Sequence, residues 1–103
     1  MIVIVQRQKE RLCELCRTYH VRRLELFGSA LNPNRFRQSS SDLDFIVEFQ
    51  PVTPGNHAKA YFALLEKLQD LFGRQIDLLE IKAVNNPYLL ESINETRSLI
   101  YAA

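Results

Sequence analysis

The chain has 103 residues, of which 47% are hydrophobic, and a formal net charge of +1 at pH 7. This size and composition predict one soluble domain that spans residues 1–103, with a single core and no room for a second domain. The near-neutral charge excludes the global basic field that drives sequence-independent binding of nucleic acids, so any site for a polyanion has to be local.

The chain begins with a short apolar stretch, MIVIV. This stretch is far shorter than the roughly 20 residues that a helix needs to cross a bilayer. It also lacks the basic leader and the small-residue cleavage site of a signal peptide. We therefore expect a cytoplasmic protein without a membrane segment.

An amphipathic helix is predicted over about residues 5–18, because apolar residues recur along one face at a spacing of three or four. Cys13 and Cys16 form a Cys-x-x-Cys pair in this helix, a pattern found in redox pairs and in half of a zinc site. No second cysteine pair or His-x-x-x-His is present to complete a tetrahedral site. We interpret both cysteines as small apolar residues of the helix.

A half-buried strand is predicted over residues 22–27, because Leu24 and Leu26 alternate with charged residues. It ends at Gly28-Ser29, where we expect a turn that opens a short helix. A polar surface loop, NPNRFRQSSS, follows over residues 32–41. The clearest strand is LDFIVEF, residues 43–49, and Pro51 punctuates its end.

The second half of the chain continues the alternation of helix and strand. Helical spacing of apolar residues predicts a helix over about 56–72, with Gly73 placed to cap it, and QIDLLEI predicts a third strand over 75–81. Pro87 suits the first turn of a short helix, and SLIYA, residues 98–102, fits either a last helical turn or an edge strand. The expected fold class is α/β (α+β), a small mixed β-sheet flanked by helices.

The histidines and most aromatic residues are interpreted as structural. His20 and His57 lie at helix ends, where structural or solvated roles are expected. The aromatic residues of the second long helix and its end are assigned to the core: Tyr61, Phe62 and Phe72. Tyr88 and Tyr101 in the tail fit either the core or a partner contact.

Two carboxylates flank one leucine at the start of the second strand. Side chains alternate between the faces of a strand, so Asp42 and Asp44 point the same way while Leu43 points to the core. Two ionised carboxylates at the edge of an apolar core raise the pKa of one of them unless a positive charge lies between. Mg²⁺ suits such a pair, because it prefers one or two carboxylates together with water and phosphate oxygens.

A third carboxylate, Asp77, interrupts the apolar run of the third strand. If this strand pairs beside the second one in suitable register, Asp77 converges with Asp42 and Asp44 on one patch of sheet. That is a geometry for metal-dependent phosphoryl or nucleotidyl transfer. Gly28 and Ser29 add a phosphate cradle, because glycine lets the backbone approach a phosphate and the amides and hydroxyl that follow donate to its oxygens.

Four segments match a known family: LFGS at 26–29, SDLDFIVEF at 41–49, IDLLEI at 76–81 and NNPYLLESINETRSLIYAA at 85–103. On these the chain resembles a polymerase-β-type nucleotidyltransferase, specifically the minimal nucleotidyltransferase (MNT) class of small prokaryotic proteins. The resemblance implies that the ATP triphosphate is held by Gly28, Ser29 and Ser41. It implies that Mg²⁺ and catalysis depend on Asp42, Asp44 and Asp77, the last completing the metal site or helping to deprotonate the acceptor hydroxyl.

The chain departs from the family pattern after Gly-Ser. Many relatives continue with a small residue and then Arg-Gly, whereas Ala30 is followed here by Leu31-Asn32-Pro33. Arg35 or Arg37 is a candidate replacement for the lost positive charge near the phosphates, and a solvated loop arginine is the alternative. The departure bears on affinity for the triphosphate more than on the fold.

The resemblance also implies a partner. Larger members of the superfamily carry a helical domain that holds the acceptor, for which this chain has no room, so we expect a docked protein partner. MNT proteins resemble antitoxins that are encoded with HEPN ribonuclease toxins. The implied activity is transfer of AMP from ATP to a tyrosine hydroxyl of the toxin, within a hetero-oligomer.

Two other hypotheses belong to different classes. In the first, the chain is a catalytically inactive nucleotidyltransferase-like antitoxin that neutralises its toxin by stoichiometric binding, which the missing Arg-Gly favours and the three retained carboxylates oppose. In the second, it is a terminal nucleotidyltransferase acting on RNA. The lack of a basic groove and of interleaved aromatic residues argues against direct nucleic-acid binding.

Overall fold

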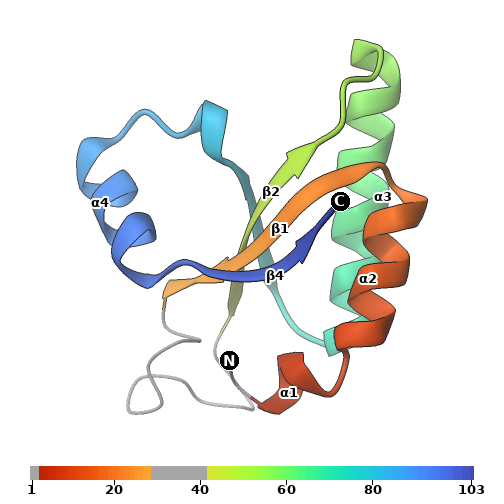
Figure 1. The fold of residues 1–103 in the computed structure, drawn as a ribbon, viewed down its shortest axis with the longest axis horizontal. Coiled ribbons are helices and arrows are strands. Elements are labelled where there is room, and N and C mark those ends of the chain that lie inside the picture. Colours follow the sequence, from red (N-terminus) through yellow and green to blue (C-terminus); the bar gives the residue numbers. More distant parts are fainter. Residues whose placement is uncertain (1–2, 29–41) are drawn as a thin grey trace.

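A computed structural model describes residues 3–28 and 42–103 of the chain, which form helices around one mixed sheet (Figure 1). The helices and strands, in chain order, are α1 Val3–Gln6, α2 Lys9–Thr18, β1 Val21–Phe27, β2 Leu43–Phe49, α3 Pro54–Phe72, β3 Ile76–Glu80, the 3-10 turn η2 Ile81–Ala83, α4 Pro87–Thr96 and β4 Ser98–Ala102. The expected fold class is confirmed. None of the described helices is long and apolar enough to cross a membrane.

The sheet has four strands in the order β3-β2-β1-β4. Strand β1 pairs antiparallel with both β2 and β4, whereas β2 and β3 are parallel and are connected through α3. A parallel pair needs such a crossover, because the chain has to return to the starting edge of the first strand. Of the two alternatives for SLIYA, the structure adopts the edge strand.

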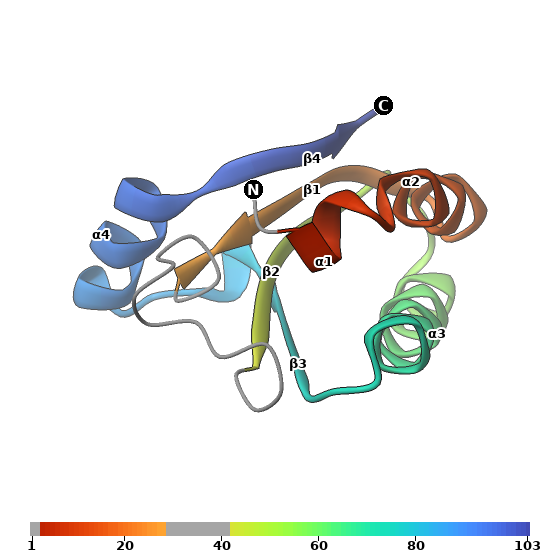
Figure 2. The ribbon, with the colours of Figure 1, turned by 90° about the horizontal axis from the view of Figure 1, so that it is seen from below.

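Helices cover the two faces of the sheet unequally. Figure 2 shows α2 and α3 on one side of the strands and α4 on the other. The main core lies under α2 and α3 and takes alternate residues from each of the two central strands, Leu24 and Leu26 from β1 and Phe45 and Val47 from β2. A smaller cluster lies under α4: Phe27, Ile46 and Ile93. The face with α4 therefore keeps part of its surface open.

The longer predicted elements agree with the structure to within a few residues. Strand β2 has the predicted bounds, and α3 begins two residues earlier than predicted, at Pro54, because proline suits the first turn of a helix. Gly73 caps α3 in the left-handed conformation, at φ +61°, and its N–H donates to the carbonyl of Gln69.

Two predictions in helical segments are wrong. The N-terminal helix is divided into α1 and α2, because the Gln8 N–H donates to the Val5 carbonyl, three residues back, and tightens the chain into a turn. Phe62, which the sequence predicts to lie in the core, is 65% exposed. The buried stripe of α3 runs through Ala60, Leu64 and Leu68, and a residue two positions from this stripe faces away from the sheet.

The cysteine interpretation agrees with the environment of the two thiols. Both cysteines are free, and Cys16 is fully buried in the main core while Cys13 is partly buried. Burial raises the pKa of the Cys16 thiol to about 12, so it is protonated at neutral pH. Cys16 therefore packs as a small apolar residue.

Candidate functional site

Asp44 and Asp77 lie side by side on the face of the sheet opposite the main core. They are direct partners in the parallel register of β2 and β3, and paired residues of neighbouring strands point to the same face. Their chain neighbours Leu43, Ile76 and Leu78 point into the main core, as the alternation predicts. Asp44 is partly buried, whereas Asp77 is exposed to solvent.

The proximity of these carboxylates perturbs the ionisation of Asp44. The pKa of Asp44 is raised from an ordinary value of 3.8 to about 7, chiefly by burial and then by the hydrogen bond and charge of Asp77 and the charge of Asp42. Asp44 therefore holds its proton to a much higher pH than an ordinary aspartate does. A divalent cation would relieve the same repulsion by replacing this proton, and oxygen ligands of this kind suit Mg²⁺.

Asp42 is less closely associated with the pair than the sequence predicts. It is exposed and precedes the first paired residue of β2, since Leu43 already opposes Ile76. Its charge acts on Asp44, yet the described residues contain no group of three histidine, cysteine or acidic side chains placed to hold one ion. The expected convergence is thus realised as the pair Asp44 and Asp77, with Asp42 outside the strand ladder.

Gly28 follows β1 and lies directly against Asp44. Its φ of +76° belongs to the left-handed region, and a Cβ atom at this position would lie 2.7 Å from Oδ2 of Asp44. The contact follows from the antiparallel register, in which Phe27 is paired with Asp44. Glycine is therefore required here both for the backbone conformation and for the space that the carboxylate occupies.

The amide of Gly28 is already engaged within the protein. Its N–H donates to Oγ1 of Thr96, at 3.0 Å, so this amide does not point at a phosphate. Donors for a phosphate would have to come from the residues that follow. The predicted contributors Ser29 and Ser41, and the arginines Arg35 and Arg37, lie outside the described residues.

Glu25 on β1 forms a buried ion pair that the sequence does not indicate. It is 3% exposed and accepts two hydrogen bonds from Arg97, Nε to Oε2 at 2.8 Å and a terminal nitrogen to Oε1 at 2.6 Å. Arg23 donates a third, at 3.0 Å. Chiefly through the Arg97 hydrogen bonds, these partners hold the pKa of Glu25 below its usual range. Arg97 lies 72 residues along the chain, so no local pattern points to it.

The histidines lie outside this site. His57 contacts Glu80 at the other end of β3, with 2.6 Å between Nε2 and Oε1, and its ring packs against Phe49. His20 adopts a left-handed turn, at φ +61°, between α2 and β1. These positions agree with the structural roles expected from the sequence.

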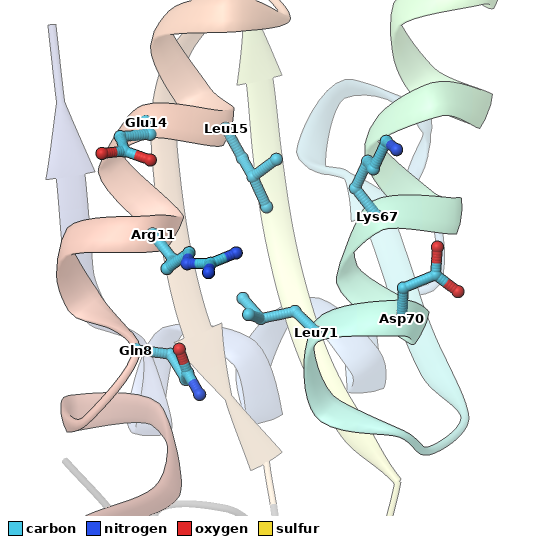
Figure 3. A pocket seen from close by; sticks show the side chains of 7 residues that line it. All are labelled: Gln8, Arg11, Glu14, Leu15, Lys67, Asp70 and Leu71. Carbon is cyan, nitrogen blue, oxygen red and sulfur yellow. The ribbon is translucent and has the colours of Figure 1, made fainter.

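A separate cavity of about 450 Å³ opens between α2 and α3 (Figure 3). Leu15 and Leu71 lie between the two helices, and charged side chains of both signs surround them: Arg11, Glu14, Lys67 and Asp70. These two helices cover the main core, on the side of the sheet opposite Asp44 and Asp77. The cavity is therefore not part of the acidic site.

Comparisons with known proteins identify the family of this chain. A family model described as polymerase beta, nucleotidyltransferase matches residues 10–103. The chain belongs to this nucleotidyltransferase family. Two relatives from Methanocaldococcus jannaschii are each named a putative protein adenylyltransferase. The match to the first is 35% identical and spans 81% of this chain and 78% of the relative. The match to the second is 37% identical and spans 95% of this chain and 90% of the relative.

Solved structures of toxin–antitoxin complexes share the fold. One is a toxin–antitoxin with AMP-PNP, which superposes with a TM-score of 0.67 at 18% identity and covers 92% of this chain and 73% of that one. Another is a tri-AMPylated Shewanella oneidensis HEPN toxin in complex with its MNT antitoxin, with a TM-score of 0.64, 17% identity and coverage of 95% and 72%. At these identities the likeness shows the fold, and it agrees with the MNT resemblance of the sequence.

Proposed function

We propose that this chain is a Mg²⁺-dependent adenylyltransferase that transfers AMP from ATP to a tyrosine hydroxyl of a partner HEPN ribonuclease toxin and thereby neutralises the toxin. The observation that carries the proposal is the pair Asp44 and Asp77, which sits on an open sheet face beside Gly28. Burying a carboxylate against a second one is unfavourable in the absence of a cation, and sites with this feature are commonly functional.

The residues in place fit a magnesium ion. Asp44 and Asp77 supply adjacent carboxylate oxygens, Asp42 adds negative charge from the end of the strand, and the raised pKa of Asp44 indicates that positive charge is favoured there. When bound, the metal would neutralise the triphosphate and the pyrophosphate that leaves. We assign Asp44 and Asp77 as the metal ligands, with Asp42 as the carboxylate that adds charge beside them, and Gly28, Ser29 and Ser41 as the residues that border the phosphates.

The reaction conserves atoms and charge in one displacement. The tyrosine oxygen forms a bond to the α-phosphorus of ATP, the bond from that phosphorus to the bridging oxygen of pyrophosphate breaks, and the hydroxyl proton passes to a carboxylate. Asp77 is the candidate acceptor, because it is the exposed member of the pair and so can be reached by a docked side chain. The protein then contributes mainly positioning and charge neutralisation.

The choice of a HEPN toxin as partner and of ATP as nucleotide is supported by similar proteins. The relatives above 30% identity are named for protein adenylyl transfer, and among the solved structures of this fold one holds AMP-PNP and another contains an AMPylated HEPN toxin. Transfer between ATP and an intracellular toxin would take place in the cytoplasm, the compartment expected from the sequence.

The test is a transfer assay with the HEPN toxin encoded beside this chain. Purified protein, toxin, Mg²⁺ and labelled ATP are expected to give toxin with the added mass of one or more AMP units. Asp44→Asn and Asp77→Asn should each lower the rate at least about a hundredfold, because each removes a charge placed at the reacting phosphates. Asp70→Asn is the matched control, since Asp70 is an exposed carboxylate on α3 beside the separate cavity, and it should transfer at the wild-type rate.

Other outcomes would overturn the proposal. Neutralisation of the toxin without transfer, by wild type and by Asp44→Asn alike, would identify a stoichiometric binding antitoxin. The departure from Arg-Gly after Ser29 is the feature of the sequence that favours this second function. Label that appears on RNA instead of on the toxin would identify a terminal RNA nucleotidyltransferase.

A further inference from the structure

Two helices of this chain end in the same way, with one difference. Helices α2 and α4 both have ten residues and end in threonine, at Thr18 and Thr96. Each hydroxyl donates to the carbonyl four residues earlier, Thr18 to Glu14 at 2.9 Å and Thr96 to Ser92 at 2.8 Å. The two hydroxyls differ in one respect. Within the described part of the chain, the Thr96 hydroxyl also accepts a hydrogen bond, from the N–H of Gly28, 68 residues away in the sequence.

The bond to Ser92 orients the Thr96 hydroxyl. A hydroxyl has one proton and two acceptor lone pairs, so donating to the Ser92 carbonyl leaves the lone pairs for the Gly28 amide. The oxygen is therefore held as an acceptor, and the backbone amide, which cannot reach a strand partner at this turn, is satisfied by it.

Gly28 stands between Thr96 and Asp44. Its N–H points to the Thr96 hydroxyl, while its Cα lies so close to Asp44 that an added Cβ would approach Oδ2 to 2.7 Å. A displacement of Gly28 therefore moves the atoms that contact Asp44, the carboxylate paired with Asp77 across β2 and β3. It also changes the direction in which the chain leaves β1.

The end of α4 that carries Thr96 is anchored on both sides. Three residues before it, Ile93 is fully buried against Phe27 and Ile46. Immediately after it, Arg97 holds the buried carboxylate of Glu25 with two hydrogen bonds. A side chain can hold a neighbouring group in place only if its own position is fixed by packing and hydrogen bonds, and Thr96 meets this condition.

We propose that Thr96 is a positioning residue of the nucleotide site: its hydroxyl holds the Gly28 turn, and through it Asp44, in the arrangement that receives the magnesium nucleotide. Thr96 itself touches neither the phosphates nor the acceptor. This inference rests on the proposed nucleotidyl transfer and extends it to the C-terminal helix, which carries none of the acidic residues.

The experiment compares Thr96→Val, which keeps the shape and removes the acceptor, with Thr96→Ser, which restores it. Thr18→Val is the matched control, because it removes the same hydroxyl bond at the end of the other helix. Hydrogen exchange of the Gly28 amide is expected to accelerate about tenfold or more in Thr96→Val and to stay slow in the other two. The melting temperature should fall further in Thr96→Val than in Thr18→Val, because only the first also leaves the Gly28 amide without its acceptor.

Measurements of nucleotide binding and of kinetics then distinguish a positioning role of Thr96 from a contribution to stability alone. In Thr96→Val the dissociation constant for magnesium AMP-PNP and the KM for ATP should rise about 3-fold to 10-fold, the effect of one hydrogen bond, with a smaller change in kcat. Thr96→Ser and Thr18→Val should match wild type. If Thr96→Val fails to fold, Thr96→Ala serves in its place with the same expectations.

Each contrary result has one reading. Unchanged nucleotide affinity and KM in Thr96→Val, with the Gly28 amide exchanging freely, would overturn the positioning role and leave a structural bond. An equal loss in Thr18→Val would do the same. If wild type binds magnesium AMP-PNP without transferring AMP, the proposed reaction fails while the binding measurements still decide the role of Thr96.

Discussion

At the scale of single residues, Gly28 meets two separate demands, and a matched glycine separates them. Gly28 and Gly73 both have positive φ, at +76° and +61°, so alanine is strained at either position. They differ in their surroundings, because a Cβ at Gly73 has no atom within 4 Å whereas one at Gly28 meets Asp44. Backbone strain and crowding of the carboxylate can therefore be measured independently.

We expect Gly73→Ala to lower the free energy of unfolding by about 1 kcal/mol, the cost of the left-handed conformation alone. Gly28→Ala should cost about 1–3 kcal/mol and, in addition, weaken binding of magnesium AMP-PNP, because the new methyl group displaces Asp44. Urea unfolding and calorimetric titration measure the two effects. Equal destabilisation by both variants with full nucleotide affinity in Gly28→Ala would show that Asp44 is not constrained by this turn.

At the scale of elements, the ion pair between Glu25 and Arg97 ties α4 and β4 to the centre of the sheet. Its carboxylate is buried, so its stability contribution depends on pH. The Arg97 hydrogen bonds lower the pKa of Glu25 in the folded chain, which means that the unfolded chain binds the proton more readily. The stabilisation is present above the unfolded pKa of about 4.5 and is lost as pH falls through the folded value.

The corresponding variant is Glu25→Gln. Above pH 5 the wild type should be more stable than Glu25→Gln by about 1.5–3 kcal/mol, the contribution of hydrogen bonds to a charged group, and the difference should shrink as pH falls below 4.5. Glu48→Gln is the control, because the partly exposed Glu48 pairs with the exposed Arg22 at 3.8 Å and should change stability by less than about 1 kcal/mol. A difference between wild type and Glu25→Gln that is constant from pH 3 to pH 7 would contradict this account.

The elements also show which parts of the structure local patterns can predict. The predicted bounds of strand β2 match the structure, because its run of apolar residues and the Pro51 that follows it are local signals. The break between α1 and α2 has no glycine or proline to mark it, and five residues of SLIYA are too few to distinguish a turn of helix from an edge strand. Contacts between distant residues, such as Thr96 with Gly28, leave no local pattern at all.

The candidate site was likewise predictable only in part. Parity along each strand predicts that Asp44 and Asp77 turn away from the core, and the structure agrees. Their adjacency depends on the parallel register of β2 and β3, which the sequence did not specify. Asp42 is predicted to join them because it lies two residues before Asp44, and it precedes the first paired residue of β2, so strand pairing does not fix the direction of its side chain.

At the scale of the whole molecule, the main core and the candidate site lie on opposite faces of the sheet. One face is buried under α2 and α3 and holds most of the core, while the other is partly covered by α4 (Figure 2). Asp77 is exposed on that second face, and Asp44 is partly buried beside it. An open acidic face costs stability when no cation is bound. This cost makes the free energy of unfolding a reporter of metal binding, even in the absence of any acceptor.

The last prediction follows from the sign of the Asp44 shift. Because its pKa rises from 3.8 to about 7 on folding, the folded chain holds the proton more tightly, and stability declines as pH increases through this window. Solvent around the exposed Asp77 weakens the electrostatic effect, so we expect the free energy of unfolding to fall by about 1–2 kcal/mol between pH 5 and pH 8. For a domain of this size this corresponds to a fall of roughly 4–16 °C in Tm. Mg²⁺ competes with the proton, so it should raise Tm at pH 8 and have little effect at pH 5.

Thermal unfolding of wild type, Asp44→Asn and Asp70→Asn, with and without Mg²⁺ at both pH values, measures this linkage. Asp44→Asn should lose both the decline with pH and the response to Mg²⁺, because the amide carries neither the proton nor the charge, and it should exceed wild type in Tm at pH 8. Asp70→Asn should keep both effects. Equal stabilisation by Mg²⁺ at pH 5 and pH 8, or in Asp44→Asn, would place the metal away from the carboxylate pair and remove the physical basis of the proposed transfer site.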